Sequence, residues 1–111
     1  MSPSFDMLRR SPEIKRVLAR GRRTTGSRVV LYVVPEGSSL RAGFACPRSM
    51  GGAVVRNRAR RLMKEAWRAS ASRVREGYEV MIVARPEIRG AELSEVAADL
   101  ELVLAAAGVL R

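Results

Sequence analysis

The sequence predicts an α+β fold in a single small domain. Two observations favour this class. The chain has 111 residues, which suits one hydrophobic core, and segments with helical spacing of apolar residues alternate with short runs of β-branched residues. Hydrophobic residues make up 47% of the chain and aromatic residues 5%. The core is therefore expected to consist mainly of aliphatic side chains.

The N-terminal segment has a different composition from the rest. Residues 1–10 contain few apolar anchors and are predicted to form a flexible basic arm, with residues 11–111 as the folded domain. This segment does not have the pattern of a signal peptide. No stretch approaches the roughly 20 apolar residues that span a membrane. A cytoplasmic protein without a membrane partner is expected.

A short helix is predicted to open the domain. Ser11 has the residue type of an N-cap and is followed by proline, which is favoured at the first helical position. Ile14, Val17 and Leu18 then share one face. Gly21 is placed to end the helix.

Three β-strands are predicted from apolar runs. Residues 28–34 are rich in β-branched side chains, and residues 40–46 alternate between apolar and other side chains. Residues 36–39 have the composition of a turn, so these two strands are expected to form an antiparallel hairpin. The third strand covers residues 78–84 and ends before Pro86.

Two longer helices are predicted at residues 54–72 and 91–107. The second has a continuous apolar stripe that would cover the sheet. Its opposite face is expected to be acidic and to consist of Glu92, Glu95, Asp99 and Glu101.

Charge is distributed unevenly along the chain. The formal net charge is +10, and residues 1–75 contain 18 of the 21 basic residues but only 4 of the 11 acidic ones. Such a field favours a polyanionic partner, because neutralised phosphates release condensed counterions. The alternative at this level is an arginine-rich protein with a merely solvated surface.

The helix predicted at residues 54–72 has two distinct faces. One is an apolar seam, and Trp67 at its border is expected to close the core. The other is a basic ridge with almost no acidic residue nearby, since Glu65 is the only carboxylate between Glu36 and Glu76. Arg58 lies at a border between the two faces. The ridge comprises Arg56, Asn57, Arg60, Arg61, Lys64 and Arg68.

RNA is favoured over DNA as the partner of this ridge. The sequence has neither a helix-turn-helix pattern nor zinc ligands with finger spacing. An α+β domain with an irregular basic loop suits recognition of folded RNA through its shape and backbone.

No catalytic or metal-binding residues are expected in this chain. It has no histidine, the usual proton-transfer group near neutral pH. Its single cysteine, Cys46, lies within a predicted strand and has no histidine to activate it. The acidic residues gather near the C-terminus rather than converging on a cleft.

The segment from Arg48 to Glu65 resembles the signature of the bacterial ribonuclease P protein family. It reads Arg-Ser-Met-Gly-Gly-Ala-Val-Val-Arg-Asn-Arg-Ala-Arg-Arg-Leu-Met-Lys-Glu. The family pattern has a basic pair and a glycine, then Ala-Val, then Arg-Asn-Arg-x-Lys-Arg with a further basic residue three positions on. Here Arg60 replaces the usual lysine and Lys64 the usual arginine, and the loop at Pro47 has one cation fewer.

This resemblance implies a fold and a role. The fold is a small α/β sandwich with three helices, a mixed sheet of about four strands and a left-handed crossover at the central basic helix. The role is to assist a catalytic RNA that, with Mg²⁺, removes the 5′ leader from precursor tRNA. The expected partners are this RNA and the leader, with no protein partner required. The expected RNA contacts are Arg48, Arg56, Asn57, Arg58, Arg60, Arg61, Lys64 and Arg68.

The family also holds the single-stranded leader in a cleft between the first helix and the sheet. The corresponding positions are Ile14 and Leu18 on the helix and Val30 and Tyr32 on the strand. Only Tyr32 is aromatic and suited to base stacking, so Ile14 and Leu18 either line the cleft or belong only to the core. Two other functions remain open at this level: a structural ribosomal protein and a general nucleic-acid chaperone.

Overall fold

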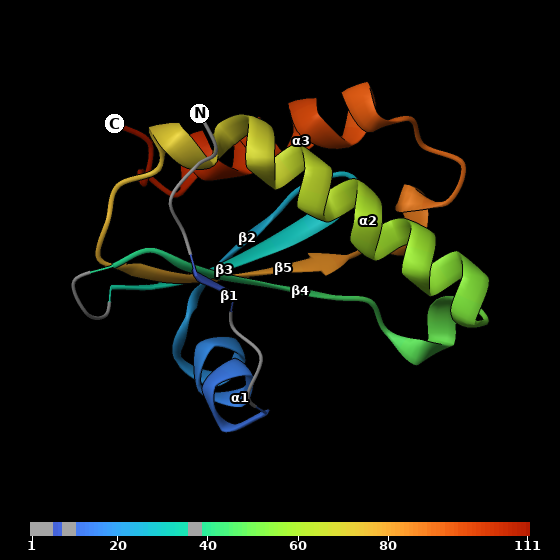
Figure 1. Ribbon diagram of the computed structural model, residues 1–111, viewed down its shortest axis with the longest axis horizontal. Coiled ribbons are helices and arrows are strands. Elements are labelled where there is room, and N and C mark those ends of the chain that lie inside the picture. The colour runs from blue at the N-terminus through green and yellow to red at the C-terminus, as the bar shows by residue number, and fades with distance from the viewer. Residues whose placement is uncertain (1–5, 8–10, 36–38) are drawn as a thin grey trace.

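A mixed β-sheet separates one helix on one face from two on the other (Figure 1). The structure is a computed structural model, and it describes residues 6–7, 11–35 and 39–111. Within these residues the α-helices are α1 (Ser11–Arg20), α2 (Ala53–Ser70) and α3 (Leu93–Ala106). The strands are β1 (Asp6–Met7), β2 (Arg22–Thr25), β3 (Val29–Pro35), β4 (Arg41–Ala45) and β5 (Tyr78–Ala84). The α+β class is confirmed.

The strand order is β1-β4-β5-β3-β2, which corrects the expected hairpin. β3 does not pair with β4, because β5 lies between them, antiparallel to β3 and parallel to β4. In this central place Val80, Met81 and Ile82 of β5 are fully buried, as expected for a strand with both faces and both edges covered. Residues 36–38 of the expected turn lie outside the described residues.

Two of the five strands were not expected from the sequence. β2 pairs antiparallel with β3 at one edge of the sheet, and its mostly exposed Arg-Arg-Thr-Thr sequence has no apolar alternation to reveal it. β1 pairs in parallel with β4 at the other edge. It belongs to the segment predicted as an arm, and the rest of residues 1–10 lies outside the described residues.

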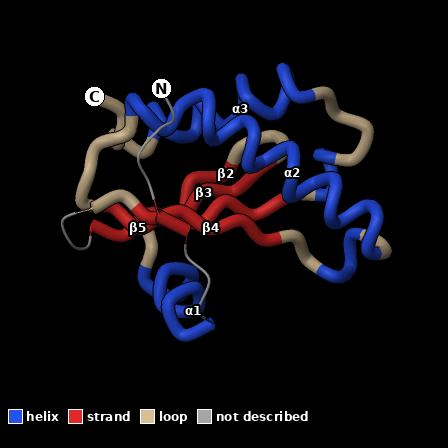
Figure 2. The backbone as a smooth tube through the Cα atoms, in the orientation of Figure 1, coloured by secondary structure: helices blue, strands red, loops and turns tan. Residues whose placement is uncertain are grey.

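The helix α2 connects two parallel, neighbouring strands. The chain leaves β4, passes through a 3-10 turn at Arg48–Met50, returns along α2 above the sheet and enters β5 (Figure 2). Gly51 precedes the helix with a φ of 151°, a conformation that favours glycine. The basic helix is therefore a crossover element, as the resemblance implies.

Two apolar layers hold the sandwich together. The larger lies between the sheet and the helices α2 and α3, and Trp67 and Met63 are fully buried within it. This confirms that Trp67 closes the core. The smaller layer lies between the sheet and α1 and centres on Val17, Val34 and Met81.

The prediction of an exposed acidic face on α3 is wrong at Asp99. Asp99 is only 6% exposed, and its carboxylate accepts hydrogen bonds from the backbone N–H groups of Ser27, Arg28 and Val29 at 2.9, 2.8 and 3.1 Å. These donors belong to the turn that leads into β3. Asp99 therefore anchors this turn to α3, a long-range role that helical periodicity does not reveal.

Replacing Asp99 by alanine should destabilise the fold by about 3 kcal/mol, because the backbone N–H groups of Ser27, Arg28 and the buried Val29 would lose their acceptor. Urea unfolding of the Asp99→Ala variant measures this free energy. Glu101→Ala is the control on the same helix, since Glu101 is half exposed and forms an ion pair with the half-exposed Arg73. Equal losses for the two variants would contradict the anchoring role.

Candidate RNA-binding surface

The basic ridge of α2 faces outward along the length of the helix. Asn57, Arg61 and Arg68 are exposed, whereas Arg56, Arg60 and Lys64 are half-buried. The opposite face packs into the core through Ala59, Leu62, Met63 and Ala66. The predicted division into a seam and a ridge is confirmed, and burial of the seam fixes the direction of the ridge.

The cations of the ridge form no ion pair with any acidic residue that the structure describes. Within the described part of the chain, the one side-chain hydrogen bond of these cations to another side chain joins Arg60 to the Asn57 amide oxygen at 2.5 Å. No acidic residue lies in the first turn of α2. The ridge is therefore a row of like charges whose compensation must come from outside the described fold.

The acidic side chains of the C-terminal half pair elsewhere. Glu95 binds Arg28 at 2.8 Å, Glu101 binds Arg73 at 2.9 Å, and Glu87 binds Arg85 at 3.3 Å. Glu92 and Glu95 also form the capping box of α3. The acidic helix therefore does not neutralise the ridge.

Two of the predicted RNA contacts lie away from the ridge. The Arg58 side chain points toward the start of α3, where its Nη2 donates a hydrogen bond to the Ala91 carbonyl oxygen at 2.9 Å. Arg48 is exposed in the 3-10 turn before α2. The structure thus brings together six of the eight residues predicted to contact RNA.

The four leader-cleft candidates differ in burial. Ile14 and Tyr32 are half-buried and pack against the small apolar layer beneath α1. Val30 is 6% exposed, whereas Leu18 is 37% exposed. Leu18 and Tyr32 thus retain accessible surface on the α1 side, and Val30 is mainly a core residue.

A network of charged residues that the sequence analysis missed fixes α1 to the sheet. Glu79 of β5 is almost fully buried and forms ion pairs with Arg16 of α1 and with Arg41 of β4. Arg41 also pairs with Glu13 of α1. The hydrogen bond to Glu13 and the charges of both carboxylates raise the pKa of Arg41 above its ordinary value, although burial opposes this. The only signal in the sequence is a glutamate within the otherwise apolar run of β5.

The described residues contain no group of three or more His, Cys, Asp or Glu side chains placed to hold a metal ion. The half-buried Cys46 contacts the Met50 sulfur at 3.4 Å. In the part of the chain that the structure describes, no helix is long and apolar enough to cross a membrane.

The family model described as Ribonuclease P matches residues 3–108 of the chain. The chain belongs to the ribonuclease P protein family. Members of this family are the protein subunit of ribonuclease P, a ribonucleoprotein endonuclease that removes 5′ leaders from precursor tRNA and whose RNA carries the catalysis.

Relatives named "Ribonuclease P protein component" are similar over nearly their whole length. The protein of Caldanaerobacter subterraneus subsp. tengcongensis is 34% identical, with 94% of this chain and 90% of that protein covered. The protein of Acidothermus cellulolyticus is 36% identical, with 94% and 89% covered.

Solved structures of ribonuclease P proteins share the fold. The Staphylococcus aureus RNase P protein has a TM-score of 0.83 at 20% identity, with 95% of this chain and 97% of that chain covered. The Thermotoga maritima RNase P protein has a TM-score of 0.77 at 19% identity, with 88% and 94% covered.

Removing the charge of Glu79 in this family member should loosen α1. The Glu79→Gln variant would leave two partly buried arginines without their shared carboxylate, which should cost about 2 kcal/mol after allowance for solvent screening. Chemical unfolding measures the loss, and hydrogen exchange should accelerate in Ser11–Arg20. Glu87→Gln, which removes an exposed partner of Arg85, should change neither quantity. Unchanged exchange in α1 would refute the tethering role.

Proposed function

We propose that this chain docks on the catalytic RNA of ribonuclease P through the basic ridge of α2. The single observation that carries the proposal is the row of ridge cations that no described acidic residue neutralises. Arg56 and Arg68 lie about 18 Å apart along the helix axis, so one rigid element meets phosphates at several points. Guanidinium groups suit this role because they bind phosphate oxygens in pairs.

The two predicted contacts outside the ridge extend this surface. Arg48 adds a cation beside the start of α2, and Arg58 adds one on the side of the helix that faces α3. The basic segment of residues 1–10 adds diffuse attraction to phosphate. Membership in the family favours this assignment over the ribosomal-protein and chaperone alternatives.

The opposite face of the sheet is proposed to guide the 5′ leader of precursor tRNA. Tyr32 supplies a ring with accessible surface for an unpaired base, and Leu18 supplies an exposed apolar side chain on α1. Ile14 supports Tyr32 from the small apolar layer beneath α1, and Val30 is buried in the same strand as Tyr32. The charged network around Glu79 holds α1 at its position over the sheet.

The chemistry of leader removal belongs to the RNA. The described residues do not fit a metal ion, because no three or more of their His, Cys, Asp or Glu side chains lie together as ligands. The Mg²⁺ that the family uses would be bound by phosphates of the RNA subunit and the substrate. This chain would contribute binding and alignment in the cytoplasm and need no protein partner.

Neutralising single ridge residues should reduce the salt dependence of RNA binding. In the Arg61→Gln variant and in the Arg68→Gln variant, one phosphate contact is lost. The magnitude of the slope of log K for RNA binding against log salt concentration should therefore fall by about 0.7–0.9 in each variant. Titration of the RNA subunit at several salt concentrations measures this slope. Arg73→Gln is the matched control, since Arg73 pairs with Glu101 of α3. A slope that stays constant in both ridge variants would refute the docking face.

Removing the ring of Tyr32 should weaken binding of precursor tRNA by about 1–3 kcal/mol, because a stacked leader base would lose its platform. Affinities of the reconstituted holoenzyme for precursor and mature tRNA test this with Tyr32→Ala. Tyr32→Phe keeps the ring and should retain the affinity. An equal loss for both tRNAs would place the effect outside the leader.

A further inference from the structure

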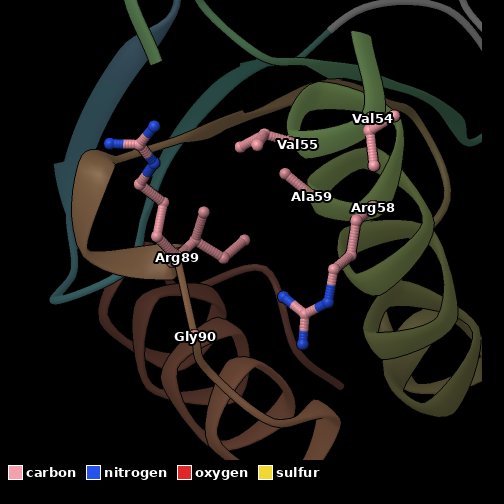
Figure 3. Close-up of a pocket in the computed structure, with 7 residues that line it drawn as sticks. Val54, Val55, Arg58, Ala59, Arg89 and Gly90 are labelled. Carbon is pink, nitrogen blue, oxygen red and sulfur yellow. The ribbon is translucent and has the colours of Figure 1, made fainter. Parts of the chain in front are cut away.

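A hollow lies beside the first turns of α2 (Figure 3). None of the residues that line it belongs to the ridge. The volume of the hollow is about 300 Å³. It opens between α2 and the segment that joins the 3-10 turn Pro86–Ile88 to α3. We name it the α2–α3 pocket; its lining residues are Val54, Val55, Arg58, Ala59, Ile88, Arg89 and Gly90.

The walls of the pocket are apolar. Ile88 and Ala59 are buried at its base, at 1% and 3% exposure, and Val55 is half-buried. At the mouth, Val54 is 83% exposed although it is β-branched and apolar. Figure 3 shows Val55 and Ala59 pointing from the helix into the hollow. The pocket thus offers an apolar surface to a flat or compact group.

Two arginines border this apolar surface. Arg58 comes from α2 and Arg89 from the facing segment (Figure 3), and neither pairs with a described acidic residue. The hydrogen bond from Arg58 to the Ala91 carbonyl oxygen fixes the direction of its side chain. A Cβ atom at Gly51 would lie only 3.0 Å from the Arg89 Nη2 atom, so glycine leaves room for this guanidinium.

We infer that the α2–α3 pocket holds one unpaired nucleobase of the RNA subunit, with the adjoining phosphates on Arg58 and Arg89. A nucleobase has apolar faces and carries negative charge through its backbone, which matches both features of the pocket. A volume of 300 Å³ lies at the small end of ligand sites and suits a single ring system. Unstacked bases also pack on arginine planes in RNA recognition.

Other occupants match only one of the two features. An inorganic anion would leave the apolar walls in water. An aromatic side chain of a protein partner would leave both arginines without a counter-charge. The inference rests on the proposed docking of α2 on RNA and deepens it: the ridge would hold the backbone on one side of the helix, while the pocket fixes one nucleotide on the other side.

Filling the pocket tests the inference. In the reconstituted holoenzyme, probing of all four bases of the RNA subunit should reveal one unpaired base that the wild-type protein protects. Ala59→Leu should restore the reactivity of that base while the other protected positions persist. The affinity for the RNA subunit should fall about 5- to 30-fold. This loss corresponds to the lower part of the range that removal of one stacked base causes. Ala69→Leu places the same side chain at an exposed site of α2 and should change neither result.

A second pair of variants keeps the test decisive if Ala59→Leu melts at a lower temperature than the wild type. Val54→Asp and Leu102→Asp each place a carboxylate at an exposed apolar helical position, with 83% and 69% exposure. Only Val54→Asp should expose the protected base. If no base changes its reactivity in either pocket variant, the inference is overturned. In that case Arg61→Gln would still weaken RNA binding, provided that the ridge docks on the RNA subunit. The pocket proposal and the ridge proposal can therefore be refuted independently.

Discussion

Burial of the apolar seam of α2 against the sheet is the constraint on which the other features depend. Met63, Ala66 and Trp67 have no exposed surface, and burial of a large apolar side chain such as Met63 stabilises the fold by about 1.5–3 kcal/mol. Because the seam is fixed, the ridge must face solvent along the whole helix. The packing energy thus holds a row of like charges in place against their mutual repulsion.

The buried acidic residues lie away from the ridge and stabilise other parts of the fold. Asp99 binds backbone N–H groups at the start of β3, and Glu79 joins α1 to two strands. Both carboxylates are buried, Asp99 against the backbone N–H groups and Glu79 against Arg16 and Arg41. The acidic residues therefore stabilise the scaffold, and the excess of positive charge remains available at the surface for a polyanion.

Local signals in the sequence predicted the helices, the three apolar strands and the ridge. The pairing of the strands could not be predicted in the same way, because the place of β5 between β3 and β4 depends on contacts between residues far apart in the chain. β2 was missed because an exposed edge strand needs no apolar alternation. The buried roles of Asp99 and Glu79 were missed because a charged residue reveals its partners only in three dimensions. The α2–α3 pocket likewise combines α2 with a segment some thirty residues later.

The crossover through α2 has a consequence for the order in which the chain can fold during synthesis. The central strand β5 follows α2 in sequence, so β3 and β4 have no shared neighbour until Tyr78–Ala84 has left the ribosome. Nearly all of the basic residues precede this strand. A nascent chain therefore presents its cations on an incomplete scaffold, and only translation of the last third of the sequence converts them into an ordered surface.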